Sequence, residues 1–236
     1  MSAAVIIPAR YQSTRFPGKA LAPLRGKPLI QHVHERSLGS RLASEVLVAT
    51  DSDEILRAVE SFGGKAVMTS PEHTSGTDRV AEAAARLDYD IIVNVQGDEP
   101  LIRADMIDAV IELLGDERAS LGTLARPAEN PPEIDNPNVV KVVFDREGFA
   151  MYFSRSPIPF RRHMGPVFQH VGIYGYRKEA LMRLTSLEPT VLERTEGLEQ
   201  LRALENGMRI KVGLTEFETI GVDTPEDLER VEKWLS

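Results

Sequence analysis

Short apolar segments alternate with helix-like segments through the first half of the chain, and this order limits the possible folds more than any other feature. The apolar segments have the length and the branched residues of buried strands. They are Ala3–Ile7, which Pro8 is expected to end, Glu45–Ala49, Lys65–Met68 and Asp90–Val95. The helix-like segments are Pro28–Leu38, Ser52–Phe62, Gly76–Leu87 and Ala104–Leu114. The alternation predicts an α/β fold, a mainly parallel central sheet with helices on both faces.

The pattern changes after Leu121. Residues 128–132 are expected to form a loop, and two apolar segments at 139–144 and 149–153 flank a polar turn, which predicts an antiparallel hairpin. The later segments predict a strand at Val171–Tyr176, helices at Arg177–Leu184 and Gly197–Asn206, a strand at Met208–Val212 and a helix at Pro225–Leu235. We therefore expect one domain over residues 1–236, with an insertion at roughly 128–190.

Composition excludes several classes of protein. The chain has 236 residues, of which 42% are hydrophobic and 27% are charged, as in ordinary globular proteins, and it has no cysteine for disulfides or thiolate metal sites. A formal net charge of −8 argues against general binding to nucleic acid. No apolar run approaches the ~20 residues of a membrane span, and residues 1–8 carry no basic leader. We expect a cytoplasmic protein that contacts neither membrane nor nucleic acid.

A basic loop follows the first strand. Arg10, Arg15 and Lys19 bring three cations into one segment, and small residues such as Ser13 and Gly18 let main-chain N–H groups approach an anion. In an open α/β fold this loop lies at the carboxyl edge of the sheet, where ligands bind. It lacks the glycine spacing of a P-loop or a dinucleotide-binding motif. The segment suits a nucleoside triphosphate, although a solvated surface loop would have a similar composition.

Two carboxylates are candidates for a metal site. Asp98 follows the fourth predicted strand, and Asp223 precedes the last helix, where Thr224 can be the N-cap and Asp227 its partner in a capping box. Asp223 is therefore not needed for capping, and both carboxylates could hold Mg²⁺ against phosphate oxygens. The simpler alternatives are a turn-forming Asp98 and a solvated Asp223.

The segment His73–Arg79 opens the third predicted helix. Ser75 or Thr77 can cap this helix, and the free N–H groups of its first turn could hold part of a nucleoside. On its own, such a segment is usually only a helix cap.

Ten segments, in order over nearly the whole chain, resemble the family of bacterial 3-deoxy-D-manno-octulosonate (Kdo) cytidylyltransferases. They are Ile6–Tyr11, Arg15–Lys19, Val48–Asp51, His73–Arg79, Asn94–Pro100, Asn136–Asn138, Tyr152–Arg155, His170–Tyr176, Leu198–Arg202 and Gly221–Leu228. The resemblance implies a Rossmann-like nucleotidyltransferase fold and transfer of CMP from CTP to the anomeric hydroxyl of Kdo, with release of pyrophosphate. It also implies Mg²⁺ as cofactor, a place in lipopolysaccharide biosynthesis and a homodimer.

The resemblance also implies roles for individual residues. The nucleotide-binding residues would be Ala9, Arg10, Ser13, Arg15, Lys19 and Ser75. The metal ligands would be Asp98 and Asp223, which form the catalytic set together with Lys19 and Arg10. The sugar-binding residues would be Gln96, Arg155, His170, Tyr174, Glu199 and Gln200. An acid sugar with a carboxylate and many hydroxyls needs such a mixture of cations, donors and acceptors.

Some alternatives stay open at this point. The segment 161–169 is shorter than in many family members, so the lid over the sugar could close differently, and the acceptor could be 8-amino-Kdo or a sialic-acid-like sugar. A non-catalytic nucleotide-binding regulator is a further alternative. The resemblance implies that the insertion serves sugar binding. Its hairpin is apolar on both faces, which predicts that it also serves dimerisation; the other possibility is that helices of the same chain cover it.

Overall fold

The computed structural model describes residues 1–12, 16–128 and 130–235. By its internal contacts the chain divides into two compact units. The first unit comprises Met1–Asp108 and Thr219–Ser236, and the second comprises Ala109–Glu218. The first unit is therefore made of two pieces of chain, and the boundary with the second unit falls inside helix α4, Ala104–Leu113.

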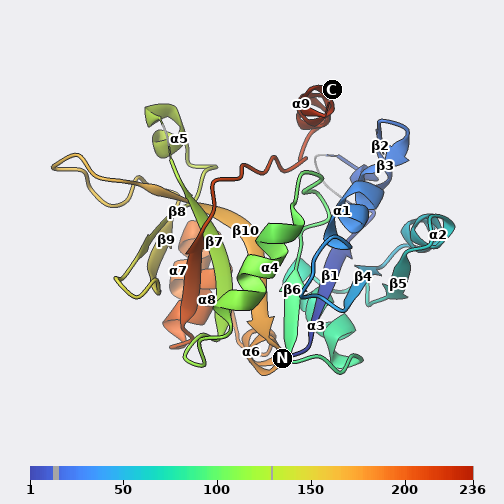
Figure 1. The fold of residues 1–236 in the computed structure, drawn as a ribbon, viewed down its shortest axis with the longest axis horizontal. Helices are drawn as coiled ribbons and strands as arrows, with labels where there is room; N and C mark the ends of the chain where they lie inside the picture. The colour runs from blue at the N-terminus through green and yellow to red at the C-terminus, as the bar shows by residue number, and fades with distance from the viewer. Residues whose placement is uncertain (13–15, 129, 236) are drawn as a thin grey trace. The chain divides into compact units, whose positions relative to one another are not determined.

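A four-stranded parallel sheet forms the centre of the first unit (Figure 1). Its order is β6-β1-β4-β5, and its strands are β1 Ala3–Ala9, β4 Glu45–Thr50, β5 Lys65–Met68 and β6 Ile91–Asn94. Every residue of β1 is buried, as the apolar sequence of this segment predicts. The four expected strands of the first half are thus confirmed.

The helices of the first unit are α1 Leu29–Ser37, α2 Asp53–Ser61, α3 Gly76–Ala85 and α9 Pro225–Trp234. The segments β1–α1–β4 and β4–α2–β5 step along the sheet in one direction, whereas β5–α3–β6 steps back past β1. Because such crossovers are right-handed, α1 and α2 lie on one face and α3 on the other. The reversal creates a switch point between the carboxyl ends of β1 and β6, where ligands bind in open α/β sheets.

The expectation that Pro8 ends the first strand is wrong. Strand β1 continues through Pro8 and Ala9, which pair with β4. The main-chain oxygen of Ile6 accepts from the N of Val95, on the side of β6. Main-chain groups two residues apart point to the same side of a strand, so the N of Pro8 also points toward the β6 side. The pairing of β1 with β6 ends at Ile6. No acceptor on β6 therefore depends on an N–H from Pro8, and the strand can continue through the proline.

Two predicted helix caps are confirmed. The Oγ of Ser75 accepts from the main-chain N of Asp78 at 3.0 Å, at the start of α3. At the start of α9, Thr224 and Asp227 form the expected capping box. These caps fix the first turns of two helices on which candidate site residues depend.

A small apolar core holds α9 in the first unit. Its buried members are Leu24, Leu29, Leu101, Val222 and Val231. The first three come from the β2–β3 hairpin (Pro23–Leu24 and Lys27–Pro28), from α1 and from the segment after β6. The C-terminal piece of the chain is thus packed against elements that begin some 200 residues earlier.

The second unit contains five further strands. In order along the sheet they are β11 Ile210–Leu214, β7 Leu121–Pro127, β10 Phe168–Arg177, β8 Lys141–Phe144 and β9 Ala150–Ser154. Only β11 and β7 are parallel. The antiparallel hairpin expected at 139–153 is confirmed as β8–β9, and the expected strand at 171–176 lies inside the longer β10.

Three elements of the second unit differ from the sequence-based expectation. Strand β7 and helix α7, Val191–Glu196, were not predicted, and residues 128–132 are not all loop, because helix α5 begins at Pro131 and ends at Asp135. Asn130 caps α5 by accepting from the N of Glu133 at 3.1 Å. Prolines in a first turn leave no hydrogen bond unmade, so this proline pair starts a helix. The remaining helices are α6 Lys178–Thr185 and α8 Gln200–Glu205.

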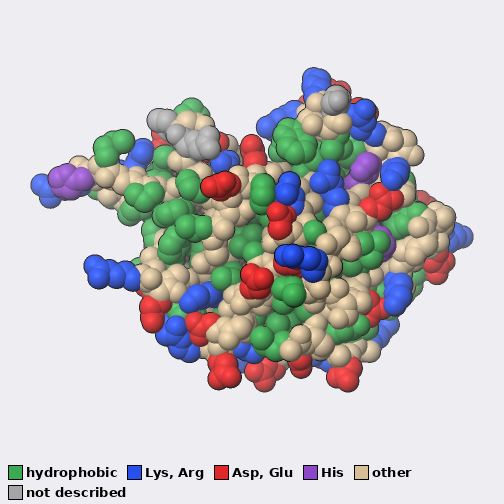
Figure 2. Space-filling view, viewed as in Figure 1, with side chains coloured by type: hydrophobic (Ala, Val, Ile, Leu, Met, Phe, Trp, Pro, Cys, Tyr) green, Lys and Arg blue, Asp and Glu red, His purple; other side chains and the backbone are tan. Residues whose placement is uncertain are grey.

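Among the described residues, no helix combines the length and the apolar sequence needed to cross a bilayer. Acidic and basic side chains are interspersed over the face drawn in Figure 2.

Candidate functional site

A pocket of about 240 Å³ opens at the switch point of the first unit. Its walls come from the ends of β1 and β6, from the start of α3, from the short helix η1 (Lys19–Leu21) and from the segment before α9. The lining residues are Pro8, Ala9, Arg10, Lys19, Ala20, His73, Thr74, Ser75, Gly76, Arg79, Gln96, Gly97, Asp98 and Asp223. Seven predicted site residues are therefore together: Ala9, Arg10, Lys19, Ser75, Gln96, Asp98 and Asp223.

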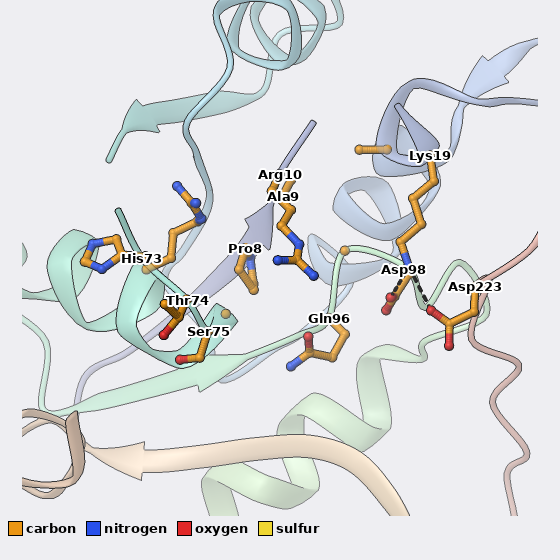
Figure 3. A pocket seen from close by; sticks show the side chains of 14 residues that line it. Pro8, Ala9, Arg10, Lys19, His73, Thr74, Ser75, Gln96, Asp98 and Asp223 are labelled. Atoms are coloured by element: carbon orange, nitrogen blue, oxygen red, sulfur yellow. Dashed lines mark hydrogen bonds and ion pairs between the residues drawn. The ribbon is translucent and has the colours of Figure 1, made fainter. Parts of the chain in front are cut away.

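The pocket has two chemically different ends. Figure 3 shows His73, Thr74 and Ser75 on one side and Lys19 with its two carboxylates on the other, with Arg10 and Gln96 between them. One end thus offers hydroxyls and an imidazole, and the other offers charge.

Lys19 lies between the two candidate metal ligands. Its Nζ donates to Asp98 Oδ2 at 2.6 Å, to Asp223 Oδ1 at 3.2 Å and to the main-chain oxygen of Val222 at 2.9 Å. The side chain of Lys19 is 16% exposed, whereas those of Asp98 and Asp223 are 29% and 47% exposed. The cluster is therefore partly sheltered but open to solvent on the side of the aspartates.

Main-chain geometry brings these three residues together. Gly18 precedes η1 with a φ of +71°, a conformation that favours glycine, and its N donates to the oxygen of Tyr11 at 2.9 Å. A Cβ on Gly97 would lie 2.7 Å from the main-chain oxygen of Pro8, so only glycine permits the close approach that aims Asp98. The N of Val222 donates to the oxygen of Asp98 at 2.8 Å, which ties the segment before α9 to the Asp98 turn.

The donor set fits a hard divalent cation. Two carboxylates and one carbonyl oxygen surround a single position, and Mg²⁺ in enzymes is held by one or two carboxylates together with substrate phosphates. Asp98 and Asp223 could thus serve as protein ligands of Mg²⁺, the role that the sequence predicts for them.

Glu99 adds a buried carboxyl next to this cluster. Burial and the neighbouring Asp98 raise its pKa to about 8, against a hydrogen bond from Thr219 that lowers it. Among the described residues, no group donates to its Oε2. At neutral pH this carboxyl is mostly protonated, so it adds little negative charge to the Asp98–Asp223 pair.

Contacts with α3 fix the end of the pocket that His73, Thr74 and Ser75 form. Glu82, on α3, accepts from the N of Ser70 at 2.8 Å, and its Oε2 lies 2.6 Å from Nε2 of His73. Arg79 is 3% exposed and bonds Asp51 at 2.6 Å as well as Thr69. Both ends of the segment 70–75 are therefore anchored to α3.

Arg10 and Gln96 lie between the two ends. Arg10 is exposed, and the Nε2 of Gln96 donates to Asn94 Oδ1 at 3.3 Å. The predicted nucleotide-binding residues Ser13 and Arg15 lie outside the described residues.

The other predicted sugar-binding residues belong to the second unit. His170 and Tyr174 both lie on β10 with ring centroids 5.3 Å apart, and Glu199 and Gln200 lie at the start of α8. His170 Nε2 is 2.9 Å from the hydroxyl of Thr123, and burial lowers the pKa of His170 to about 3, so its ring is neutral. Burial raises the pKa of Tyr174, and the charge of Glu199 raises it further.

The guanidinium of Arg155 bonds to the protein's own main chain, unlike a cation that is available to bind a sugar. Its guanidinium donates to three main-chain oxygens, those of Glu196 at 2.7 Å, Pro137 at 3.0 Å and Gly197 at 3.4 Å. Its own main-chain N donates to the Glu196 carboxylate at 2.9 Å. In this structure Arg155 connects β9, the end of α7 and the 136–138 loop.

Several lining residues were not predicted as site residues. His73, Thr74 and Arg79 belong to the segment that was singled out for Ser75, and a four-residue helical spacing places Ser75 and Arg79 on one face. Glu99 lies in the Asn94–Pro100 segment, but the sequence predicts no role for it. Its burial depends on packing between segments far apart in sequence, which no local pattern indicates.

Comparisons with known proteins agree with this geometry. The family described as Cytidylyltransferase matches residues 4–210. Curated proteins named 3-deoxy-manno-octulosonate cytidylyltransferase are 54% identical in Thermodesulfovibrio yellowstonii (98% of this chain, 97% of the relative) and 56% identical in Geotalea daltonii (98% and 97%). A solved structure of CMP:2-keto-3-deoxy-manno-octonic acid synthetase complexed with CTP is 42% identical, with a TM-score of 0.96 over 100% of this chain and 98% of that one. This likeness confirms the expected nucleotidyltransferase-like fold.

Proposed function

Because the chain belongs to the family of 3-deoxy-manno-octulosonate cytidylyltransferases, we propose that it transfers CMP from CTP to the anomeric hydroxyl of Kdo, releasing pyrophosphate. The observation that carries the proposal is the pocket at the switch point, with a polar end at the start of α3 and a charged end at Lys19, Asp98 and Asp223. A relative named as the synthetase of CMP-2-keto-3-deoxy-manno-octonic acid was solved with CTP, which supports CTP as the nucleotide.

We place the nucleoside at the Ser75 end and the phosphates at the Lys19 end. The first turn of α3 offers main-chain N–H groups, and the hydroxyls of Thr74 and Ser75 can bond a ribose or a base. Arg10, between the two ends, is exposed and free to pair with the α-phosphate. Ala9 and Gly97 leave room for the main chain to approach the nucleotide.

The reaction is an in-line displacement. The anomeric oxygen of the sugar bonds to the α-phosphorus and its hydroxyl proton passes to water, while the bond from that phosphorus to the bridging oxygen of the β-phosphate breaks and pyrophosphate leaves with the electron pair. Asp98 and Asp223 would hold Mg²⁺, which supplies positive charge against phosphate oxygens. Lys19 and Arg10 neutralise the α-phosphate and the leaving group, and the rigid pocket aligns the attacking oxygen.

As sugar-binding candidates we propose Gln96 in the first unit and, separately, His170, Tyr174, Glu199 and Gln200 in the second unit. A neutral His170 can donate or accept a hydrogen bond, whereas Glu199 accepts from hydroxyls. Arg155 fits a positioning role better than direct contact, because its guanidinium already donates to three main-chain oxygens. Residues 128–190 remain our proposed insertion for sugar binding and dimerisation.

A pyrophosphate-release assay tests this function. With CTP and Kdo, we expect steady release that needs both substrates and a divalent cation. Kdo should be preferred to 8-amino-Kdo and to sialic acid, and CTP to UTP, because uracil inverts the donor–acceptor pattern at position 4 and leaves fixed polar groups unpaired. Nucleotide binding without release in the presence of any of the three sugars would favour a non-catalytic regulator instead.

Two wider features are proposals as well. A cytoplasmic location fits a protein that draws on the cellular CTP pool. A homodimer fits the exposed apolar side chains of the second unit, among them Met151 on β9, which is 66% exposed.

A further inference from the structure

The position of Lys19 conflicts with the binding of a metal ion. Its Nζ lies within 3.2 Å of three oxygens, those of Asp98, Asp223 and the main chain of Val222. Figure 3 shows the ammonium group placed between the two carboxylates. These are the hard oxygen donors on which a divalent cation would depend, so the ammonium group and a metal ion compete for the same lone pairs.

The local charges make this competition strong. Lys19 compensates one of two adjacent negative charges, and its side chain is only 16% exposed, so solvent and salt screen the pairing less than they screen surface ion pairs. Two arginines also line the pocket: Arg10 is exposed, and Arg79 pairs with Asp51, whereas Lys19 donates to both aspartates. Lys19 is therefore the group that a metal ion has to displace.

Lys19 also has a second kind of acceptor within the proposed function. A lysine ammonium sits on a flexible four-carbon stem with three rotatable donors, so it can move from carboxylates to phosphates. A nucleoside triphosphate brings several negative charges to the charged end of the pocket. Once Lys19 has turned to the phosphates, it no longer occupies the oxygens of the two aspartates, and a cation that the phosphates also bind can take its place.

We propose that Lys19 is an internal counter-ion that keeps divalent cations out of the Asp98–Asp223 site until a nucleoside triphosphate draws it away. This inference rests on the proposed function for the identity of the nucleotide. It makes binding ordered: nucleotide and metal enter together, and metal alone binds weakly. It also explains why a lysine is useful at this position, since it holds two like charges together before substrate arrives.

Binding of Mn²⁺ to the nucleotide-free, full-length protein tests the proposal directly, with the free ion measured by electron paramagnetic resonance. Lys19→Met should bind Mn²⁺ at least tenfold more tightly than the unmodified protein, a change of about 1.4 kcal/mol. Lys19→Arg, which keeps the charge, should not tighten binding. Lys27→Met is the matched control, because Lys27 pairs with Glu35 on the surface, and it should bind like the unmodified protein. Adding Asp98→Asn to Lys19→Met should abolish the gain.

Nucleotide supplies the second arm of the experiment. A CTP analogue with a methylene group between the α- and β-phosphates should raise the Mn²⁺ affinity of the unmodified protein by a larger factor than that of Lys19→Met, because only the former has a counter-ion to release. An equal factor for both proteins would overturn the proposal.

Equal or weaker Mn²⁺ binding by nucleotide-free Lys19→Met, with far-ultraviolet circular dichroism and thermal melting unchanged, would also overturn the proposal. If that variant does not fold, Lys19→Gln provides the same comparison with a polar side chain. The first arm uses neither CTP nor Kdo, so its result is independent of catalysis. A protein that fails to transfer CMP could still show the metal competition, and an active transferase could lack it.

Discussion

Cationic side chains of this protein differ in how much of their hydrogen-bonding capacity the protein itself uses. Arg79 and Arg155 donate to fixed protein acceptors, and each connects separate segments of its unit. Arg10 is exposed, whereas Lys19 is bonded to groups that a metal would need. Residue type alone therefore does not identify a substrate-binding cation; the acceptors around it do.

The two pocket aspartates give the first prediction. Asp98→Asn and Asp223→Asn each keep the shape of the side chain and remove one negative charge, so each should lower kcat by about a hundredfold or more, the scale expected when one charge-stabilising group is lost. Steady-state pyrophosphate release at saturating Mg²⁺ measures this effect, with circular dichroism as the control for folding. Near-normal turnover of either variant would remove that residue from the metal site.

Asp108 gives a prediction about pH. Burial raises its pKa, but hydrogen bonds from Ser40, Leu42 and Arg41 outweigh burial, and the net pKa lies below the ordinary value of 3.8. The folded protein therefore favours the charged form, and this stabilisation is complete above about pH 4 and is lost as pH falls through the lower folded-state pKa.

Asp108→Asn should accordingly lower the free energy of unfolding by about 1–3 kcal/mol at pH 7, since it replaces a charged acceptor with an amide. Urea unfolding at pH 7 and at pH 3 measures the effect, which should shrink at the lower pH. A destabilisation that is the same at both pH values would contradict the assigned cause. The guanidinium of Arg41 contributes little because this side chain is 83% exposed, whereas the main-chain N of Arg41 donates to Asp108 at 3.0 Å.

At the scale of elements, the hairpin β8–β9 contains an unexpected buried cation. Lys141 is fully buried on β8, and its Nζ donates to the main-chain oxygens of Asn136 at 3.0 Å, Val139 at 2.5 Å and Arg155 at 2.6 Å. Burial and the nearby Arg155 lower its pKa. One side chain thus fixes the loop before β8 and the end of β9.

Lys141→Met should lower the free energy of unfolding by about 2 kcal/mol or more, because it removes a hydrogen bond from each of three main-chain oxygens, of which that of Asn136 keeps the N of Val139 as a donor. Chemical denaturation measures the loss. Lys65→Met is the matched control: Lys65 is 70% exposed and pairs with Glu45, and its loss should change the free energy of unfolding much less. Similar small losses for both variants would show that water or rearrangement replaces the Lys141 bonds.

Local patterns predicted the elements of the first unit well, since its strands are short, apolar and separated by capped helices. They failed where tertiary context decides. Pro8 continues β1 only because pairing with β6 has already ended, and the proline pair of 131–132 starts a helix only because Asn130 caps it. In the site, the pocket residues around Lys19 and Ser75 could be predicted from their place after strands. The burial of Glu99 and the main-chain contacts of Arg155 could not, because they depend on segments that meet only in the folded chain.

At the scale of the whole molecule, the proposed homodimer gives the last prediction. The second unit exposes Met151, Phe160, Met164 and Val191 by 66%, 91%, 96% and 72%. Contiguous apolar surfaces are typical of interfaces with another protein chain, and we propose that these side chains belong to one. Static light scattering at micromolar concentration should therefore give twice the 26.2 kDa mass of one chain.

Met151→Asp should shift this mass toward that of one chain, because the change puts a charge on the outer face of β9. Met68→Asp is the control: Met68 lies on β5 of the first unit, is 37% exposed, and should leave the mass unchanged. A fully active protein with the mass of a single chain would contradict the dimer.

The first unit is built from two pieces of chain that are separated by the whole of the second unit. On the ribosome, residues 1–108 emerge with Lys19 and Asp98, but Asp223 follows only after another 110 residues, Ala109–Glu218, have been synthesised. Until then Lys19 can pair with Asp98 but not with Asp223. Helix α9 is also missing from the small core around Leu24 and Leu29. A nascent chain can therefore complete the charged end of its pocket only after the whole second unit has been synthesised.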